Sequence, residues 1–157
     1  MSMRKLTATA AAVVLAGMGA IVPAGSAQSS EPAPSGIPDT CTDNWRDATR
    51  GYVYAYRYTL CDGYLGRTGS WDSNWGNSSG PFRGNDDNAA TSVLNKGRYK
   101  TVKFFRLSSY RGGHTCLKRS DAYDRDLGGN YFTGSIPVNN RISSHKWVTG
   151  GCSRFLD

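Results

Sequence analysis

Residues Asp87–Ser92 (DNAATS) and Asn139–Ser144 (NNRISS) are two copies of one six-residue pattern in a chain of 157 residues. Each copy has Asp or Asn at its first two positions, Ser or Thr at its fifth and Ser at its sixth. One copy can arise by chance, but two copies in corresponding places indicate a duplicated unit. The duplication predicts a domain built from two related halves.

A second repeat precedes each copy of this polar pattern. Both halves contain an aromatic residue, five other residues, a second aromatic residue, one further residue and a glycine. We expect the glycine to adopt a positive φ angle in a hairpin and the aromatic rings to cover the turn. The residues of this repeat are Tyr58, Tyr64 and Gly66 in the first half and Phe104, Tyr110 and Gly112 in the second.

The rest of the pattern is that of short strands separated by turns. Aromatic and β-branched residues predict strands at 52–58, 100–107 and 142–148. The segment Asp72–Pro81 consists mainly of turn formers and is expected to be a loop, and residues 119–134 are expected to be irregular. No window of ten or more residues has helical periodicity. The sequence therefore predicts an all-β domain.

The first 27 residues have the features of a secretory signal peptide. Arg4 and Lys5 precede an apolar segment, Leu6–Val22, which is followed by small residues up to Ala27. A membrane anchor is the alternative, but glycines interrupt the segment and it is short for a span. We expect cleavage after Ala27 and a secreted, extracellular protein with no membrane span.

The chain that follows this leader is expected to form one domain. Residues 28–40 are rich in Pro and Ser and predict a disordered arm. Residues 41–157 suffice for one domain, with one repeat unit at about 51–95 and the other at about 98–150. Removing Arg4 and Lys5 lowers the formal net charge from +7 to +5, which favours anionic partners. We expect a monomer.

Four cysteines remain after the leader. An even number in an exported chain predicts two disulfides, with three possible connectivities. No Cys-x-x-Cys spacing occurs, so a zinc site or redox centre is disfavoured. We expect Cys41 to pair with Cys61 and Cys116 with Cys152, an arrangement that closes one loop in each half.

The aromatic-glycine hairpin followed by the polar pattern resembles the motif pair of the βγ-crystallin superfamily. The resemblance covers about residues 51–148 and implies a β-sandwich of two Greek-key motifs. The export signal and cysteine pairs make the chain similar to the secreted actinobacterial branch, and most of all to the Streptomyces metalloproteinase inhibitor family. This likeness implies a binding protein that inhibits an extracellular metalloprotease. It does not define the inhibitory loop, for which residues 62–80 and 121–134 are both candidates.

The resemblance also implies two calcium sites shared between the polar segments. In calcium-binding members, the Ser or Thr of one segment completes the site begun by the other. Asp87 is the one carboxylate in the two segments, so we expect weak affinity, roughly 10⁻⁴ to 10⁻³ M. The alternative is that these residues only stabilise turns. Carried over by position, the ligands are the side chains of Asp87, Asn88, Thr91, Asn139, Asn140 and Ser143 and the backbone carbonyls near Ala89 and Arg141.

Other catalytic and metal-binding motifs are incomplete or missing. Asp124–Gly129 begins like a helix-loop-helix calcium loop, but its twelfth position is Ser135 instead of Glu. After the leader the one glutamate is Glu31, and neither Gly-x-Ser-x-Gly nor His-Glu-x-x-His occurs. His114 and His145 could form an acid/base pair that cleaves RNA, but structural histidines are the simpler interpretation. We expect no enzymatic activity.

A basic segment with interleaved aromatic residues suggests a competing function. Such a segment is typical of surfaces that bind nucleic acid or an anionic cell-wall polymer, as in an antimicrobial, killer-toxin-like protein. The simpler interpretation is a solvated hairpin face whose aromatic rings turn to the core. The basic residues are Lys96, Arg98, Lys100, Lys103, Arg106, Arg111, Lys118 and Arg119, and the aromatic ones are Tyr99, Phe104, Phe105 and Tyr110.

Overall fold

The structure, a computed structural model, describes residues 40–157, so the predicted signal peptide and residues 28–39 of the predicted arm lie outside the described residues. Thr40, the last residue of that arm, instead begins the helix α1 (Thr40–Asp47). Its hydroxyl donates a hydrogen bond to the backbone carbonyl of Leu60, which fixes the start of the helix on the first half of the domain. Among the described residues, no helix has the length and apolar composition needed to cross a bilayer.

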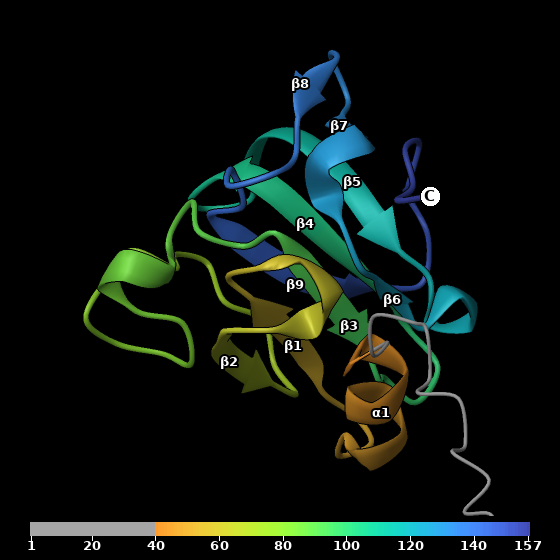
Figure 1. Ribbon diagram of the computed structural model, residues 1–157. Coiled ribbons are helices and arrows are strands. Elements are labelled where there is room, and N and C mark those ends of the chain that lie inside the picture. The colour runs from red at the N-terminus through yellow and green to blue at the C-terminus, as the bar shows by residue number, and fades with distance from the viewer. Residues whose placement is uncertain (1–39) are drawn as a thin grey trace, which may run out of the picture. The chain divides into compact units, whose positions relative to one another are not determined.

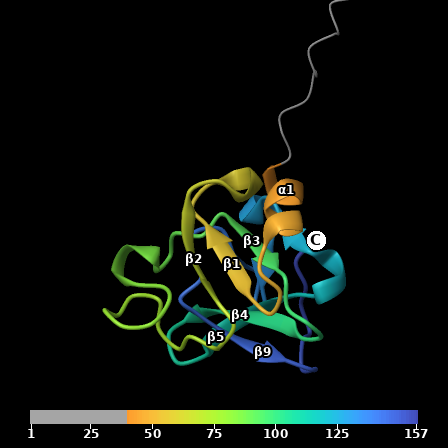
Figure 2. The same ribbon diagram turned by 90° about the horizontal axis from the view of Figure 1, so that it is seen from below.

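The described chain forms two antiparallel sheets in two layers (Figures 1 and 2). The first sheet contains β1 (Val53–Tyr56), β2 (Tyr64–Thr68), β3 (Ser92–Asn95) and β6 (Tyr123–Asp124) in the order β2-β1-β3-β6. The second contains β4 (Thr101–Leu107), β5 (Arg111–Leu117) and β9 (Ser144–Val148) in the order β5-β4-β9. The remaining elements are the strand pair β7 (Tyr131–Phe132) and β8 (Ile136–Pro137) and the 3₁₀ turns η1 (Thr59–Cys61), η2 (Gly84–Asp86), η3 (Arg119–Asp121) and η4 (Leu127–Gly129).

The prediction of an all-β fold is confirmed. The strands predicted at 52–58, 100–107 and 142–148 correspond to β1, β4 and β9. The segment 119–134, which we expected to be irregular, contains β6, β7 and two 3₁₀ turns. These strands have two residues each, too few for alternation along the sequence to reveal them.

The two halves exchange one short segment each. β6 belongs to the second half but pairs with β3, with Val93 opposite Asp124. In return, Asp72 of the first half forms a bridge to His145 in β9 of the second sheet. Each sheet is therefore extended at one edge by backbone of the other half, by β6 in the first sheet and by the single Asp72 bridge in the second, which gives the Greek-key-like arrangement of the sandwich.

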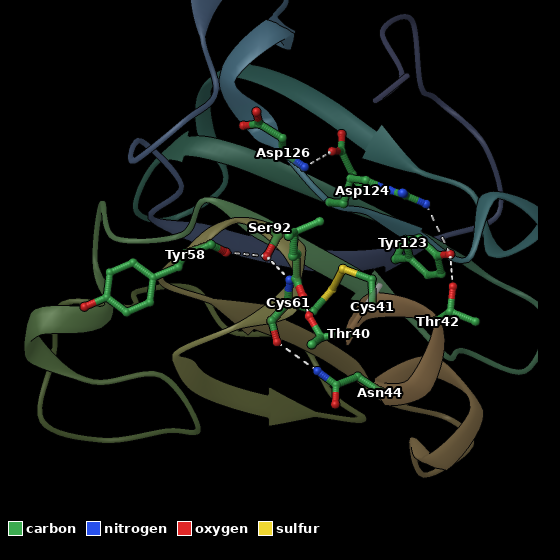
Figure 3. Close-up of a disulfide and its surroundings, with 12 residues drawn as sticks. Thr40, Cys41, Thr42, Asn44, Tyr58, Cys61, Ser92, Tyr123, Asp124 and Asp126 are labelled. Atoms are coloured by element: carbon green, nitrogen blue, oxygen red, sulfur yellow. Dashed lines mark hydrogen bonds between the residues drawn. A yellow bond between two sulfur atoms is a disulfide. The ribbon is translucent and has the colours of Figure 1, made fainter. Parts of the chain in front are cut away.

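A third repeat supports this exchange. The segments Trp71–Gly76 (WDSNWG) and Tyr123–Gly128 (YDRDLG) share the pattern aromatic-Asp-x-Asn/Asp-x-Gly. Asp72 and Asp124 are 6% and 5% exposed, and Oδ1 of each accepts the backbone N–H two residues ahead at 2.9 Å. Figure 3 shows this bond between the Asp126 N–H and Asp124. The side chain at that position in turn accepts the glycine N–H, at 3.0 and 2.8 Å. The segment that begins like a calcium loop thus has a turn-forming role.

The hydrophobic core lies between the sheets. Alternating residues of the first sheet, Val53, Ala55 and Val93, and of the second, Val102 and Phe104, are fully buried in one cluster. The clustering of residues from both sheets shows that the sheets pack face to face.

The other face of the first sheet is covered by α1. Tyr54, Tyr56 and Leu94 point to this face and form a second cluster with Cys41, against which Trp45 packs. Burial on both faces explains why β1 and β3 lack polar alternation. The helix has eight residues, too few for the periodicity that we required, so the sequence did not predict it.

Both predicted disulfides are confirmed. Cys41–Cys61 joins α1 to η1, and Cys116–Cys152 joins β5 to the C-terminal segment (Figure 3 for the first). Each disulfide lies within one half, so each half is crosslinked separately.

The two aromatic-glycine hairpins differ in detail from the prediction. Gly112 has φ +75°, as expected. Gly66 is not at positive φ; a Cβ there would lie 2.7 Å from the Pro81 carbonyl oxygen, so close packing requires glycine.

The aromatic partners are also shifted. Phe104 points into the core, and its neighbour Phe105 packs on Tyr110 with ring centroids 5.7 Å apart. In the first hairpin Tyr56, rather than Tyr58, packs on Tyr64 at 6.1 Å. Phe104 and Phe105 are adjacent in β4, so strand alternation turns them to opposite faces. Tyr58 lies beyond the end of β1, whose last residue is Tyr56.

His145 is an integral part of the core. It is fully buried, and its Nδ1 accepts a hydrogen bond from Trp75 Nε1 at 3.0 Å. Because an indole N–H can only donate, the proton lies on Nε2, which donates to the Ser70 carbonyl at 3.2 Å. Burial lowers the pKa of His145 to about 4.

Removing a disulfide tests the crosslinks. The double variant Cys116→Ser/Cys152→Ser opens a loop with a sequence separation of 36, and Cys41→Ser/Cys61→Ser opens one of 20. Loop entropy predicts losses in unfolding free energy of roughly 4 and 3 kcal/mol, measured by denaturant unfolding. A larger loss for the shorter loop would contradict the entropic account.

The variant His145→Gln should alter the dependence of stability on pH. The pKa of His145 falls from 6.5 to about 4 on folding, so its contribution is present above pH 6.5 and is lost as pH falls through 4. Between about pH 7.5 and pH 4 the wild type should lose roughly 3 kcal/mol of unfolding free energy relative to His145→Gln, whose amide oxygen can still accept from Trp75. Urea unfolding across this range measures the difference.

Burial raises the pKa of Asp124 to about 6, so its contribution has the opposite sign: it is present below pH 3.8 and lost as pH rises through 6. The contribution of Asp124 to stability is the same in the wild type and in His145→Gln, so it cancels when the two proteins are compared. Identical pH profiles for wild type and His145→Gln would refute the assigned role of the histidine.

Candidate metal centre at the paired polar segments

The strand exchange brings the two polar segments against each other. The backbone N–H of Asn88 donates to the Ile142 carbonyl at 3.0 Å, and that of Asn140 donates to the Ala90 carbonyl at 2.9 Å. The second residue of each segment thus bonds to the backbone of the other segment. The resulting pair has approximate two-fold symmetry.

The side chains repeat this crosswise arrangement. Thr91 Oγ1 donates to Asn140 Oδ1 at 3.2 Å, and Ser143 Oγ donates to Asn88 Oδ1 at 3.4 Å. The fifth residue of each segment therefore lies beside the second residue of the other, as the resemblance implies for shared sites. Asn88 and Asn140 both have φ 55°, a conformation that Asn tolerates better than most residues.

The first residue of each segment has a buried oxygen without a partner among the described residues. These atoms are Asp87 Oδ1 and Asn139 Oδ1. The other carboxylate oxygen of Asp87 accepts the side-chain amide of Asn88 at 2.8 Å. A buried acceptor without a partner is destabilising, and a cation or water would satisfy it. Both halves leave this atom free at the same position of the pattern.

The sixth residue of each segment stabilises a hairpin and is turned away from the metal centre. Ser92 Oγ donates to the Tyr58 carbonyl at 2.6 Å and accepts the backbone N–H of Cys61 at 3.0 Å (Figure 3). Ser144 makes the equivalent pair of bonds. Its Oγ donates to the Leu107 carbonyl at 2.7 Å and accepts, at 3.2 Å, the backbone N–H of the residue three positions after Leu107. Both copies have Ser at this position, and this shared Ser is the feature of the sequence that indicates the role.

The polar segments border a hollow of about 780 Å³. Six of the eight predicted ligand residues line it, whereas Ala89 and Thr91 do not. The hollow includes one carboxylate, Asp87, and two guanidinium groups, Arg106 and Arg141. These positive charges oppose a cation. The ligand residues in the lining are Asp87, Asn88, Asn139, Asn140, Arg141 and Ser143.

The donor set suits a hard cation. Among the described residues, no three His, Cys, Asp or Glu side chains come together to hold a metal ion. Amide, hydroxyl and carboxylate oxygens are calcium ligands, whereas zinc prefers nitrogen and sulfur. The donor types present therefore fit calcium.

The two histidines do not form an acid/base pair. His145 is fully buried, so no substrate can reach it. His114 lies in β5 with its Nε2 3.2 Å from Ser153 Oγ. Burial, and then the charge of Lys103, lower the pKa of His114.

Two solved structures of βγ-crystallin domains are similar to this chain. The first, from work on the evolution of the eye lens βγ-crystallin domain fold, is 18% identical, with 66% of this chain and 91% of that chain covered and a TM-score of 0.49. The second, a βγ-crystallin from an archaeon, is 19% identical, with 64% and 100% covered and a TM-score of 0.47. Because the sequence identities and TM-scores are this low, the description of the fold rests on the strand pairing of this chain itself.

No family model and no curated protein sequence matches the chain. The metalloproteinase inhibitor branch therefore stays a prediction from the sequence.

Proposed function

We propose that this chain is an exported binding protein that takes calcium weakly at the paired polar segments. The observation that carries the proposal is the pair of buried oxygens without partners, Asp87 Oδ1 and Asn139 Oδ1, at equivalent positions. The two disulfides support an oxidising, extracellular location.

The two sites differ in charge. The site that combines Asp87, Asn88 and Ser143 has a carboxylate, whereas the site that combines Asn139, Asn140 and Thr91 has none. Calcium affinity rises with ligand charge, so the first site binds more tightly. Bound calcium would replace the missing partner of the Asp87 oxygen and hold the two segments together.

Calcium titration tests the proposal. For a dissociation constant of roughly 1 mM, about 10 mM calcium adds about 1.4 kcal/mol to the unfolding free energy and raises Tm by roughly 5 °C. Asp87→Ala should abolish the calorimetric heat and the shift, and Arg141→Gln should strengthen binding by removing a positive charge. The exposed control Asp121→Asn should behave as wild type.

Wild-type protein that gives neither heat nor a Tm shift at about 10 mM calcium would exclude a site in the range proposed. If Asp87→Ala still binds like wild type, calcium binds elsewhere.

A second proposal is inhibition of an extracellular metalloprotease by the loop between β2 and β3. Residues 76–81 protrude from the sheets in Figure 1 and are flanked by Trp75 and Phe82, which are fully buried and stack at 4.1 Å. The Phe82 N–H also reaches Asp72 Oδ2 at 3.4 Å, and Arg83 Nε donates to the Gly80 carbonyl at 2.6 Å. A loop held at both ends loses little entropy on binding a cleft.

An inhibition assay with a thermolysin-like protease tests this second proposal. We expect micromolar wild-type protein to inhibit peptide hydrolysis. Ser78→Glu, at the loop tip, should weaken inhibition at least about tenfold, since a charge would be buried in the complex. Ser120→Glu, an exposed residue outside the loop, is the control. Full protease activity with excess wild-type protein would eliminate the proposal.

A further inference from the structure

Three surface hollows lie end to end. None of the residues that line them also lines the hollow at the candidate metal centre. The first, of about 260 Å³, shares Gly97, Arg98 and Tyr99 with the second. The second shares Gly69, Lys100 and Trp147 with the third. The three together form a continuous depression, which we call the basic groove.

Six cations line the basic groove, and among its lining residues there is no Asp or Glu. They come from four separate parts of the sequence, so the tertiary structure assembles them. Burial, and then the charges of Arg50 and Arg119, lower the pKa of Lys96. Asp47 partly offsets the positive charge at Lys96, but positive groups gathered with no carboxylate in the lining favour an anionic ligand. The six are Arg50, Lys96, Arg98, Lys100, Arg119 and Lys146.

Only half of the basic segment predicted from the sequence takes part. Lys96, Arg98, Lys100 and Arg119 line the groove, whereas its other four cations do not. Phe104 and Phe105 are buried, as the simpler interpretation expected. The groove therefore depends on tertiary structure rather than on the segment as a whole.

The first hollow also has a rigid floor. Trp45 lines it, and its buried Nε1 has no partner among the described residues. Lys96 Nζ lies over the Trp45 ring, 3.4 Å from the centroid, and donates to the Trp45 carbonyl at 2.6 Å. Asn95 is held rigidly, because it accepts the Gly97 N–H at 2.8 Å and donates to the Leu117 carbonyl at 2.9 Å. Positive charge above a fixed floor suits a phosphate oxygen.

Exposed aromatic rings line the groove beyond this hollow. Tyr99 is 92% exposed and Trp71 is 64% exposed, far more than large rings usually are. Trp147 lies between them in the shared lining, and its Nε1 donates to the Ser70 carbonyl at 3.0 Å, which fixes the indole. Flat faces beside cations are the features that hold single-stranded nucleic acids, where bases stack and phosphates pair with cations.

We infer that the basic groove binds single-stranded nucleic acid, with a backbone phosphate in the first hollow and bases stacked on Tyr99 and Trp71. A polyol phosphate of the cell wall would use the same cations but has no planar base to use the exposed rings. The rings therefore favour the polynucleotide. This site is independent of the metal centre, because their linings have no residue in common.

Fluorescence anisotropy with a labelled oligothymidylate of roughly 20 nucleotides, at about 50 and 200 mM NaCl, tests the inference. If four cations are engaged, log K should fall with log salt with a slope of about −3. Tyr99→Ala should weaken binding roughly 5- to 100-fold without changing this slope. Arg98→Ala/Arg119→Ala should weaken binding and make the slope shallower by about 1.4.

Matched controls lie outside the groove. Arg154→Ala removes an exposed charge, and Tyr131→Ala removes a ring that is 40% exposed, so both should bind as wild type. Thermal unfolding of every variant checks that the fold is retained.

Two outcomes would overturn the inference. One is no binding at about 50 mM NaCl. The other is a folded Tyr99→Ala variant that binds as wild type, together with equal competition by a ring-free polyol phosphate, which would identify a general polyanion site.

Discussion

The exchange of one short segment each between the halves is the constraint on which the rest of this structure depends. Asp72 bridges to His145 in the second sheet, and β6 pairs with β3 in the first. A buried Asp at the start of each exchanged segment accepts a backbone N–H and shapes the turn that follows. Because each sheet needs residues from both halves, neither half can complete its core alone.

The exchange also explains why the two polar segments meet. Three of their positions have separate roles: the second supplies a left-handed Asn, the fifth contacts the other segment, and the sixth fixes a hairpin of its own half. These roles use the hydrogen-bonding capacity of most polar atoms in the pair. The first position, Asp87 and Asn139, keeps a buried oxygen with no such role.

Two surfaces of opposite chemistry result from one scaffold. The hollow beside the polar segments gathers oxygen donors, although Arg106 and Arg141 weaken its attraction for a cation. The basic groove gathers cations and exposed rings without carboxylates in its lining. Their chemistry allows one site for a hard cation and another for a polyanion. Different variants test the two sites.

The sequence by itself determined the all-β class, the duplication, the presence of two disulfides and the polar residues of the candidate metal centre, whereas it left three cysteine connectivities open. These follow from local composition and spacing, which the chain carries without knowledge of its packing. It did not reveal the two-residue strands, the short helix α1, or which of two adjacent rings, Phe104 or Phe105, faces the core. Only the tertiary structure decided these features and the groove cations, because pairing, burial and proximity depend on residues such as Arg50 and Lys146 that lie far apart in the chain.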